Sequence, residues 1–293
     1  MNLWQEFRQP TSIAEAIEDL TSAPKPVIPI AGGSDLLLDI RQGRHTAVHT
    51  LVDMKSVREM NLIELRGDEL YIGASVSITR IITDPLVLKN AQALVEACNL
   101  IAGPQVRNIA TLGGNVAHAL PAADGTIAMT ALDAQAEVAN PEGLRRMAFV
   151  DLFKGPGKSA IDKSTEIITG FYIQKSADGQ ASCFKRIMRP QGVALPILNC
   201  AVWVHREGNT VRDAHISVGP GGPTPFRGID AESHLKGQEF SDELLKCALE
   251  QLMNQAKFRT SPRRATADYR KHIVQDLFKD TFTTAWNLAD REA

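Results

Sequence analysis

Two glycine-containing loops are the segments of this 293-residue sequence whose residue types could bind a cofactor. The first has the sequence IAGGSD (residues 30–35), and the second has the sequence TLGGN (residues 111–115). Because glycine tolerates positive φ and has no side chain, consecutive backbone N–H groups can point into one concavity there. Such a concavity binds anions, most often phosphate.

Each loop also carries a hydroxyl group and lies near a carboxylate. Ser34 and Asp35 belong to the first loop, whereas Thr111 opens the second, which is followed by Asp124. Two such loops suit a dinucleotide, because N–H groups can hold its pyrophosphate while carboxylates or amides hold its sugar and ribityl hydroxyls. The alternative is that both loops are simple turns.

Other nucleotide and hydrolytic signatures are missing from the sequence. No G-x-G-x-x-G motif occurs, and the GKS at residues 157–159 has Leu152 where a P-loop needs its first glycine. His45 and His49 have the spacing of a zinc-protease helix, but Thr46 stands in place of its glutamate. No nucleophile elbow is present either, so we expect no P-loop, zinc-protease or esterase chemistry.

Composition excludes further classes of protein. The 32 basic and 34 acidic residues give a formal net charge of −2, which argues against nucleic acid as the main partner. The four cysteines are far apart in sequence, so they are expected as small buried residues and not as ligands of a metal or cluster. No apolar run approaches membrane-spanning length, and the first residues do not resemble a secretory signal. These features favour the cytoplasm.

Hydrophobic patterning predicts a mixed N-terminal half. Ser12 and Glu15 form a capping box before a short helix. The apolar stripe of residues 86–101 predicts one continuous helix, whereas residues 104–125 lack periodicity and predict a long functional loop. A helix is expected to start near Thr126. Strands are expected at residues 27–30, 49–54, 69–75 and 136–143, and residues 36–40 could form either a helix or a strand.

The C-terminal part predicts an antiparallel sheet backed by helices. Alternating patterns indicate strands at 181–188, 197–206 and 210–218, the last two joined by a hairpin turn. Helices are expected after Ser241 and over residues 266–288. The fold class is therefore α+β.

Longer motifs around the two loops make the chain resemble a known family. AGGSDL (31–36) is followed by IAGPQVRNIATLGGN (101–115) and later by Pro121 and Asp124, and Phe184-Lys185 with Arg189 follow further on. This set resembles the FAD-binding subunit of the molybdenum hydroxylases, which include bacterial xanthine dehydrogenase, carbon monoxide dehydrogenase and nicotinate dehydrogenase. The resemblance covers essentially the whole chain.

The resemblance implies a fold and a set of FAD contacts. It implies a two-part FAD-binding domain of the vanillyl-alcohol-oxidase type over residues 1–175, with lobes at about 1–55 and 56–175, and a C-terminal α+β domain over residues 176–293. The two glycine loops would hold the FAD pyrophosphate. Asp124 would bind a cofactor hydroxyl, unless it is only a helix N-cap. Lys185 would lie near the cofactor, unless it is a solvated lysine. The residues expected to bind FAD are Ile30, Ala31, Gly32, Gly33, Ser34, Asp35, Leu36, Ile101, Thr111, Gly113, Gly114, Asn115, His118, Asp124 and Lys185.

The resemblance also implies a function and its partners. The chain would be an electron-transfer subunit that takes electrons from the [2Fe–2S] clusters of an iron–sulfur subunit and passes them to NAD⁺ or another acceptor. Molybdopterin would belong to a further subunit. The alternatives are a stand-alone FAD oxidoreductase and an FAD-less structural subunit. The sequence departs from the family pattern at His118 and Leu120, so His118 could either contact FAD or face solvent.

Overall fold

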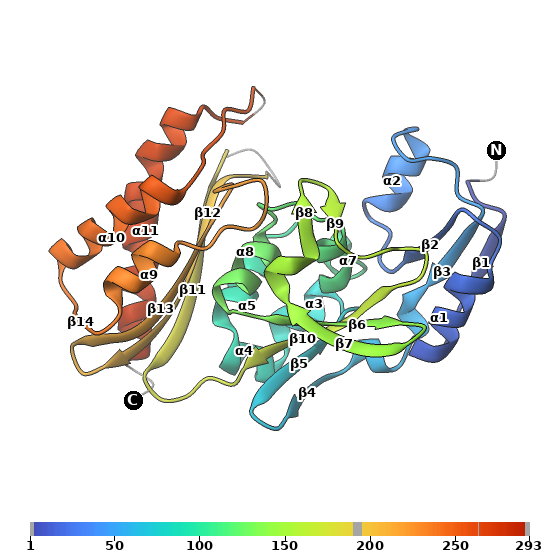
Figure 1. Ribbon diagram of the computed structural model, residues 1–293, viewed down its shortest axis with the longest axis horizontal. Helices are drawn as coiled ribbons and strands as arrows, with labels where there is room; N and C mark the ends of the chain where they lie inside the picture. Colours follow the sequence, from blue (N-terminus) through green and yellow to red (C-terminus); the bar gives the residue numbers. More distant parts are fainter. Residues whose placement is uncertain (1–2, 190–194, 263, 291–293) are drawn as a thin grey trace.

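Three β-sheets follow one another along the long axis of the molecule. A computed structural model describes residues 3–189, 195–262 and 264–290. In Figure 1 the N-terminal sheet lies at the right, the second sheet in the middle and the C-terminal sheet at the left. The chain is a mixture of helix and sheet, which confirms the predicted α+β class.

The N-terminal sheet is small and parallel. Its strand order is β1-β3-β2, formed by β1 (Glu6–Arg8), β2 (Val27–Ile30) and β3 (Thr50–Asp53). Helix α1 (Ile13–Ser22) packs on this sheet. Helix α2 (Leu36–Arg41) follows the first glycine loop, so residues 36–40, which could have been helix or strand, form a helix. The Ser12 hydroxyl caps α1 as predicted, whereas the Glu15 carboxylate accepts from the Thr11 N–H instead of the Ser12 N–H.

The second sheet is antiparallel, with the order β4-β5-β10-β6-β7. Its strands are β4 (Ile63–Arg66), β5 (Glu69–Gly73), β6 (Gln135–Asn140), β7 (Gly143–Ala148) and β10 (Ile167–Gln174). The helices of this part are α3 (Ile78–Thr83), α4 (Pro85–Asn90), α5 (Gln92–Asn99), α6 (Pro104–Arg107), α7 (Leu112–Ala117) and α8 (Asp124–Ala131). A short hairpin of β8 (Phe153–Gly155) and β9 (Lys158–Ser159) lies above them in Figure 1.

The predicted continuous helix over residues 86–101 is wrong, because the chain breaks at Ala91. This residue has φ −147° and ψ 53°, which ends α4 and begins α5. The buried Asn90 side chain stabilises the break: its amide donates to the Leu86 carbonyl at 2.8 Å, and its oxygen accepts from the Ser176 N–H at 3.1 Å. The apolar stripe is thus shared between two helices of different direction.

The predicted long loop over residues 104–125 is also wrong, since it contains α6, α7 and the start of α8. Because glycine disfavours helix interiors, the two glycines in α7 lower the helix propensity of this segment. The Thr111 hydroxyl caps α7, and Gly113 packs so closely on Ala74 that a β-carbon would lie 2.6 Å from the Ala74 carbonyl oxygen. Tertiary packing therefore selects a helix that the local sequence disfavours.

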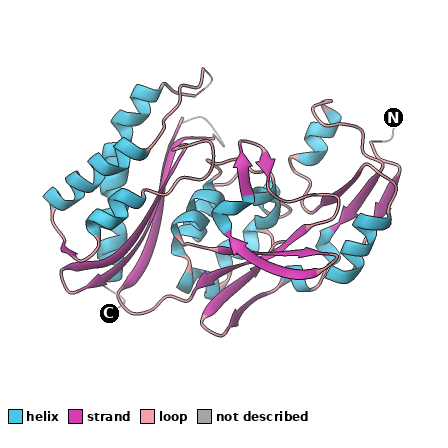
Figure 2. Cartoon of the chain, in the orientation of Figure 1, coloured by secondary structure: helices cyan, strands magenta, loops and turns pink. Residues whose placement is uncertain are grey.

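The C-terminal sheet has the antiparallel order β11-β12-β13-β14, as the patterning predicted. Its strands are β11 (Gln180–Met188), β12 (Pro196–Glu207), β13 (Thr210–Gly219) and β14 (Gln238–Glu239), and its helices are α9 (Ile229–Leu235), α10 (Asp242–Gln255) and α11 (Ala267–Ala289). Gly208, with φ +60°, forms the predicted hairpin turn. Figure 2 shows helices on both faces of this sheet: its own helices cover one, and helices of the preceding part, including α5 and α8, cover the other.

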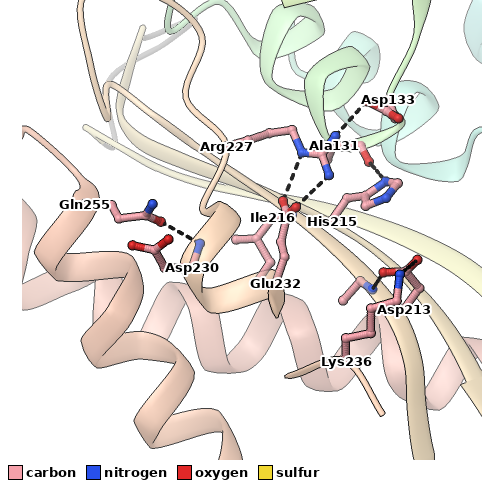
Figure 3. Close-up of polar contacts among 11 residues, drawn as sticks. Ala131, Asp133, Asp213, His215, Ile216, Arg227, Asp230, Glu232, Lys236 and Gln255 are labelled. Atoms are coloured by element: carbon pink, nitrogen blue, oxygen red, sulfur yellow. Dashed lines mark hydrogen bonds and ion pairs between the residues drawn. The ribbon is translucent and has the colours of Figure 1, made fainter. Parts of the chain in front are cut away.

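A polar network fastens the C-terminal sheet to the preceding part (Figure 3). The Arg227 guanidinium contacts Asp133 at 2.6 Å and Glu232 at 2.6 Å, and the Glu232 carboxylate accepts from the Ile216 N–H at 2.8 Å. His215 stacks on Trp203, and its Nδ1 lies 3.2 Å from the carbonyl oxygen of Ala131. Ala131 and Asp133 belong to the N-terminal side, so these contacts fix how the two parts are oriented.

Candidate functional site

The first glycine loop leaves β2 at its carboxyl end and leads into α2. Gly33 has φ +66°, the left-handed conformation that favours glycine. Within the described part of the chain, no acceptor hydrogen-bonds the N–H groups of residues 32–35, and the first bonded N–H is that of Leu37, which donates to the Gly33 carbonyl at 3.0 Å. Unpaired N–H groups around a left-handed glycine are a suitable receptor for a phosphate. The loop thus has the left-handed glycine and the unpaired N–H donors that a phosphate receptor needs, and the phosphate site itself stays a prediction.

The two glycine loops lie against each other, as a shared cofactor site requires. A β-carbon on Gly32 would overlap the Ile109 carbonyl oxygen and would lie 2.8 Å from the Ala110 α-carbon. The backbone of the first loop thus touches the chain immediately before Thr111. Only glycine permits this contact, so Gly32 has a packing role that its sequence context did not reveal.

The second loop differs from the predicted N–H concavity. The Leu112 and Gly113 N–H groups donate to the carbonyls of Val76 and Ala74, at 3.3 and 2.9 Å. The N–H groups of the next two residues donate to the Thr111 hydroxyl and carbonyl, both at 3.0 Å. Because these four donors already have partners within the chain, the second loop supports the site as a capped helix and not as a second anion receptor.

Asn115 and the start of α8 place unpaired polar atoms beside this helix. Within the described residues, the buried Asn115 Oδ1 and Thr126 Oγ1 have no hydrogen-bond partner. Gly125 packs close to the Asn115 amide, and a β-carbon there would lie 2.9 Å from Oδ1. A buried oxygen without a donor is costly, so a ligand hydroxyl would stabilise the Asn115 side chain.

Asp124 ties the two parts of the molecule together. It is the first residue of α8, whose N-cap is Ala123, and its carboxylate does not cap the helix, so the N-cap alternative is wrong. The buried carboxylate pairs with the Arg186 guanidinium of β11 and accepts from the Asn199 amide of β12 at 2.8 Å. Burial raises the pKa of Asp124, while Arg186 and Asn199 act in the opposite direction.

Lys185 lies on the other face of β11 from Arg186. Its ammonium group contacts Asp280 at 2.7 Å and Thr284 at 2.8 Å, both on α11. The structure therefore does not bring Lys185 to the glycine loops. Lys185 does line an open cavity of about 620 Å³ at the edge of β11, together with Leu100 at the end of α5.

The remaining predicted residues lie around the second loop. Ile101 is half-buried, and its carbonyl accepts from Arg107 at 3.0 Å. His118 follows the end of α7 with an exposed side chain, and Leu120 is exposed as well. Of the two alternatives for His118, the geometry favours solvent exposure.

Sequence reasoning missed Arg186 and Asn199. Arg186 directly follows Lys185, and strand alternation alone would have placed one of these two cations on each face of β11. Nothing in the local sequence marked Asn199, because its partners Ala122 and Asp124 are more than 70 residues away.

The described residues contain neither a metal-binding cluster nor a membrane-spanning helix. No group of three or more His, Cys, Asp or Glu side chains in that part of the chain is arranged to hold a metal ion. None of its helices has the length and apolarity needed to cross a bilayer.

Comparison with protein families divides the chain into two matched regions. Residues 4–174 match the FAD binding domain in molybdopterin dehydrogenase, and residues 182–285 match the CO dehydrogenase flavoprotein C-terminal domain. Both regions contain residues that the geometry connects, since Asp124 lies in the first and Arg186 in the second.

Individual relatives match over nearly their whole length. The nicotine 6-hydroxylase medium subunit of Paenarthrobacter nicotinovorans is 31% identical over 280 residues, covering 95% of this chain and 96% of the relative. The putative xanthine dehydrogenase FAD-binding subunit of Escherichia coli (strain K12) is 28% identical over 282 residues and 95% of each chain.

Solved structures agree with this assignment. A carbon monoxide dehydrogenase structure from Hydrogenophaga pseudoflava superimposes with a TM-score of 0.90 at 26% identity, covering 97% of both chains. The quinoline 2-oxidoreductase of Pseudomonas putida 86 gives a TM-score of 0.88 at 25% identity, covering 97% of this chain and 98% of the other. The chain therefore belongs to the family of FAD-binding subunits of the molybdenum hydroxylases and is an FAD-dependent oxidoreductase subunit of the xanthine dehydrogenase type.

Proposed function

We propose that this chain binds FAD with the pyrophosphate on residues 32–35 and serves as the electron-relay subunit of its complex. It takes electrons from [2Fe–2S] clusters of an iron–sulfur subunit and passes them to NAD⁺ or another acceptor, while a molybdopterin-binding subunit oxidises the organic substrate. The observation that carries the proposal is the loop of unpaired N–H groups around the left-handed Gly33, pressed against the backbone before Thr111.

The chain's own residues bind and orient the cofactor. FAD, when bound, supplies the redox chemistry, because it can exchange electrons singly or in pairs. The N–H groups of residues 32–35 would donate hydrogen bonds to the pyrophosphate, and the adjacent residues Ile30, Ala31 and Leu36 would shape this loop. In α7 the Thr111 hydroxyl accepts from the Gly114 N–H and Gly113 packs on Ala74, which fixes the helix, and Asn115 would accept a hydrogen bond from a cofactor hydroxyl through its unpaired Oδ1.

Asp124 remains available to a cofactor hydroxyl despite its two partners in the chain. A carboxylate offers about four acceptor positions, of which Arg186 and Asn199 use two. In this arrangement the Arg186 guanidinium orients the Asp124 carboxylate. Lys185 lines the cavity at the edge of β11, and Ile101 directly follows Leu100 of the same lining, so both residues would lie toward the cofactor's ring end.

The proposed domain boundary lies at residues 175/176. The parallel sheet supports a first lobe over residues 1–55, the five-stranded sheet supports a second over residues 56–175, and the third sheet supports a separate domain over residues 176–293.

We place the complex in the cytoplasm, in keeping with the expectation from the sequence.

Anaerobic absorption spectroscopy tests the relay. The isolated, FAD-loaded chain should be yellow and should bleach with dithionite, yet should stay oxidised with purines, nicotinate, carbon monoxide or aldehydes. Adding the iron–sulfur and molybdopterin-binding subunits should let one of these substrates bleach the flavin. Rapid bleaching of the isolated chain would instead favour a stand-alone oxidoreductase, and failure to take up FAD would favour a structural subunit.

A further inference from the structure

Positive charge is concentrated in one segment of this acidic protein. Residues 257–272 contain six basic residues and one acidic residue, whereas the whole chain has a formal net charge of −2. The basic residues of this segment are Lys257, Arg259, Arg263, Arg264, Arg270 and Lys271, and the acidic one is Asp268. Such a segregation of charge creates a local field that attracts anionic partners.

Four arginines gather where this segment meets the end of β11, and we call Arg189, Arg259, Arg264 and Arg270 the arginine patch. The Arg270 guanidinium donates to the carbonyls of Ile197, at 3.0 Å, and Arg259. Arg189 donates to the Arg264 carbonyl at 3.3 Å. These bonds hold the four residues close together, and the acceptors that they give to the Arg189 and Arg270 guanidinium groups are all neutral carbonyls.

The arginine patch has no carboxylate partners within the described residues. Elsewhere among the described residues nine arginines form ion pairs, for example Arg227 with Asp133 and Glu232. The sequence of residues 190–194, PQGVA, contains no acidic residue either. Asp268 is exposed on the first turn of α11 and forms no ion pair with the patch in the described structure.

The proximity of like charges lowers the pKa of these groups. The pKa of Arg270 is lowered by burial and then by the positive charges of Arg259 and Arg264, and that of Arg264 is lowered by burial and by Arg259. By contrast, Glu232, Asp133 and Asp213 help to raise the pKa of Arg227. Arg270 is only 1% exposed, so its charge is largely withdrawn from water. An incoming anion would relieve this repulsion.

Exposed apolar side chains lie near members of the arginine patch in sequence. Leu195 is 66% exposed, Tyr269 is 46% exposed and Met188 is 37% exposed. They lie near the ends of β11, β12 and α11 that Figure 1 shows at the top of the C-terminal domain. Arginine, tyrosine and methionine are residue types enriched at protein–protein interfaces. A free phosphate, by contrast, would gain little from exposed leucine and methionine side chains.

We propose that the arginine patch is a docking surface for an acidic face of a partner subunit in the same complex. The proposal rests on the proposed function, because that function requires a partner. The carboxylates of the partner would pair with the guanidinium groups of Arg189, Arg259 and Arg264, whereas the buried Arg270 would act only through its charge. Leu195, Tyr269 and Met188 would be covered at the same time. Contacts of this kind steer association and make it sensitive to salt.

Association of the FAD-loaded full chain with its iron–sulfur and molybdopterin-binding subunits, measured at increasing NaCl concentrations, tests the proposal. The double variant Arg189→Glu/Arg264→Glu should associate about tenfold or more weakly at low salt, because like charges then face each other. The neutral variant Arg189→Gln/Arg264→Gln should fall between it and the wild type. Both variants should lose part of the salt dependence.

A matched control carries the same change of charge elsewhere on the C-terminal domain. Arg212→Glu/Lys246→Glu alters two exposed residues of β13 and α10, and it should leave association unchanged. Equal association and equal salt dependence of all variants would overturn the docking surface. A second result would also overturn it: the isolated chain binds pyrophosphate tightly, and Arg189→Gln/Arg264→Gln loses this binding but keeps subunit association. That result would identify a small-anion site.

Flavin absorbance of the same samples separates this proposal from the proposed function. If the wild-type chain takes up no FAD, the proposed function fails whatever the salt series shows. If all variants keep FAD and associate equally, only the docking surface fails.

Discussion

Replacing Asp124 by alanine removes the carboxylate that joins α8 to β11 and β12. The side chains of Asp124 and Arg186 are each only 5% exposed, and the Asn199 amide donates to the same carboxylate. The variant therefore leaves a buried guanidinium without its counter-charge. Removing one partner of a buried ion pair typically costs about 3–5 kcal/mol, and we expect a loss of this size in the free energy of unfolding.

The size of this loss matters against the whole stability of the chain. Native proteins are stable by about 5–15 kcal/mol, so Asp124→Ala should consume a large share of that margin. Replacing both partners should cost less than the sum of the single changes, because a buried pair exchanged for apolar residues leaves no isolated charge. The coupling between Asp124→Ala and Arg186→Met should be about 1–3 kcal/mol.

Urea unfolding of wild type, Asp124→Ala, Arg186→Met and the double variant measures this coupling, with and without FAD. Asp124→Asn is the conservative control, since it keeps the shape but removes the charge. Titration of each folded apoprotein with FAD then measures how much each substitution changes the affinity for FAD. If Asp124 also holds a cofactor hydroxyl, Asp124→Ala should weaken FAD binding by about 1.5–3 kcal/mol.

A loss below about 1 kcal/mol, with additive single and double variants, would refute the role of Asp124 as an interdomain tie. If FAD affinity still fell, Asp124 would act on the cofactor alone. If unfolding and FAD binding were both unaffected, the buried pair would have neither role.

Three further predictions concern the loops and the domain contact. Gly33→Val places a β-branched residue at φ +66° and should abolish FAD uptake while far-UV circular dichroism stays unchanged; full flavin occupancy would contradict it. Gly113→Val should unfold the chain instead, because its side chain would collide with Ala74, and a wild-type melting temperature would show that α7 can move away. Burial and then Arg227 lower the pKa of His215 below its ordinary 6.5. The stability that the neutral His215 contributes is therefore present above that pH and is lost as the pH falls through the lowered value. His215→Gln should flatten this pH dependence of the unfolding free energy.

The regular elements of the fold follow closely from the sequence. The strands β11 to β13 have alternating or continuous apolar patterns and a glycine turn, and both features act locally. Ser12 and Ser241 cap helices where the sequence predicts, because an N-cap needs only its own next three residues.

The failures share a different cause. Ala91 breaks a helix because Asn90 is held by the distant Ser176, and α7 forms because Gly113 packs on Ala74. In both cases a contact remote in sequence outweighs local propensity. No window of neighbouring residues contains that information.

The candidate site divides in the same way. The positive φ of Gly33 could be expected from the Gly-Gly pair, and the meeting of the two loops could be expected from the family resemblance. That Asp124 pairs with Arg186 and Asn199, and that Lys185 faces α11, depends on how β11 sits between two layers of helices. This arrangement is a property of the assembled fold.

Equilibrium titration of the apoprotein with FAD, with riboflavin as the comparison ligand, tests the central claim most directly. If the N–H groups of residues 32–35 bind the pyrophosphate, FAD should bind at one equivalent and far more tightly than riboflavin, which has no phosphate. Gly33→Val should remove this difference. Equal affinity for the two ligands, or a wild-type preference for FAD in Gly33→Val, would contradict the assignment of this loop as the pyrophosphate site.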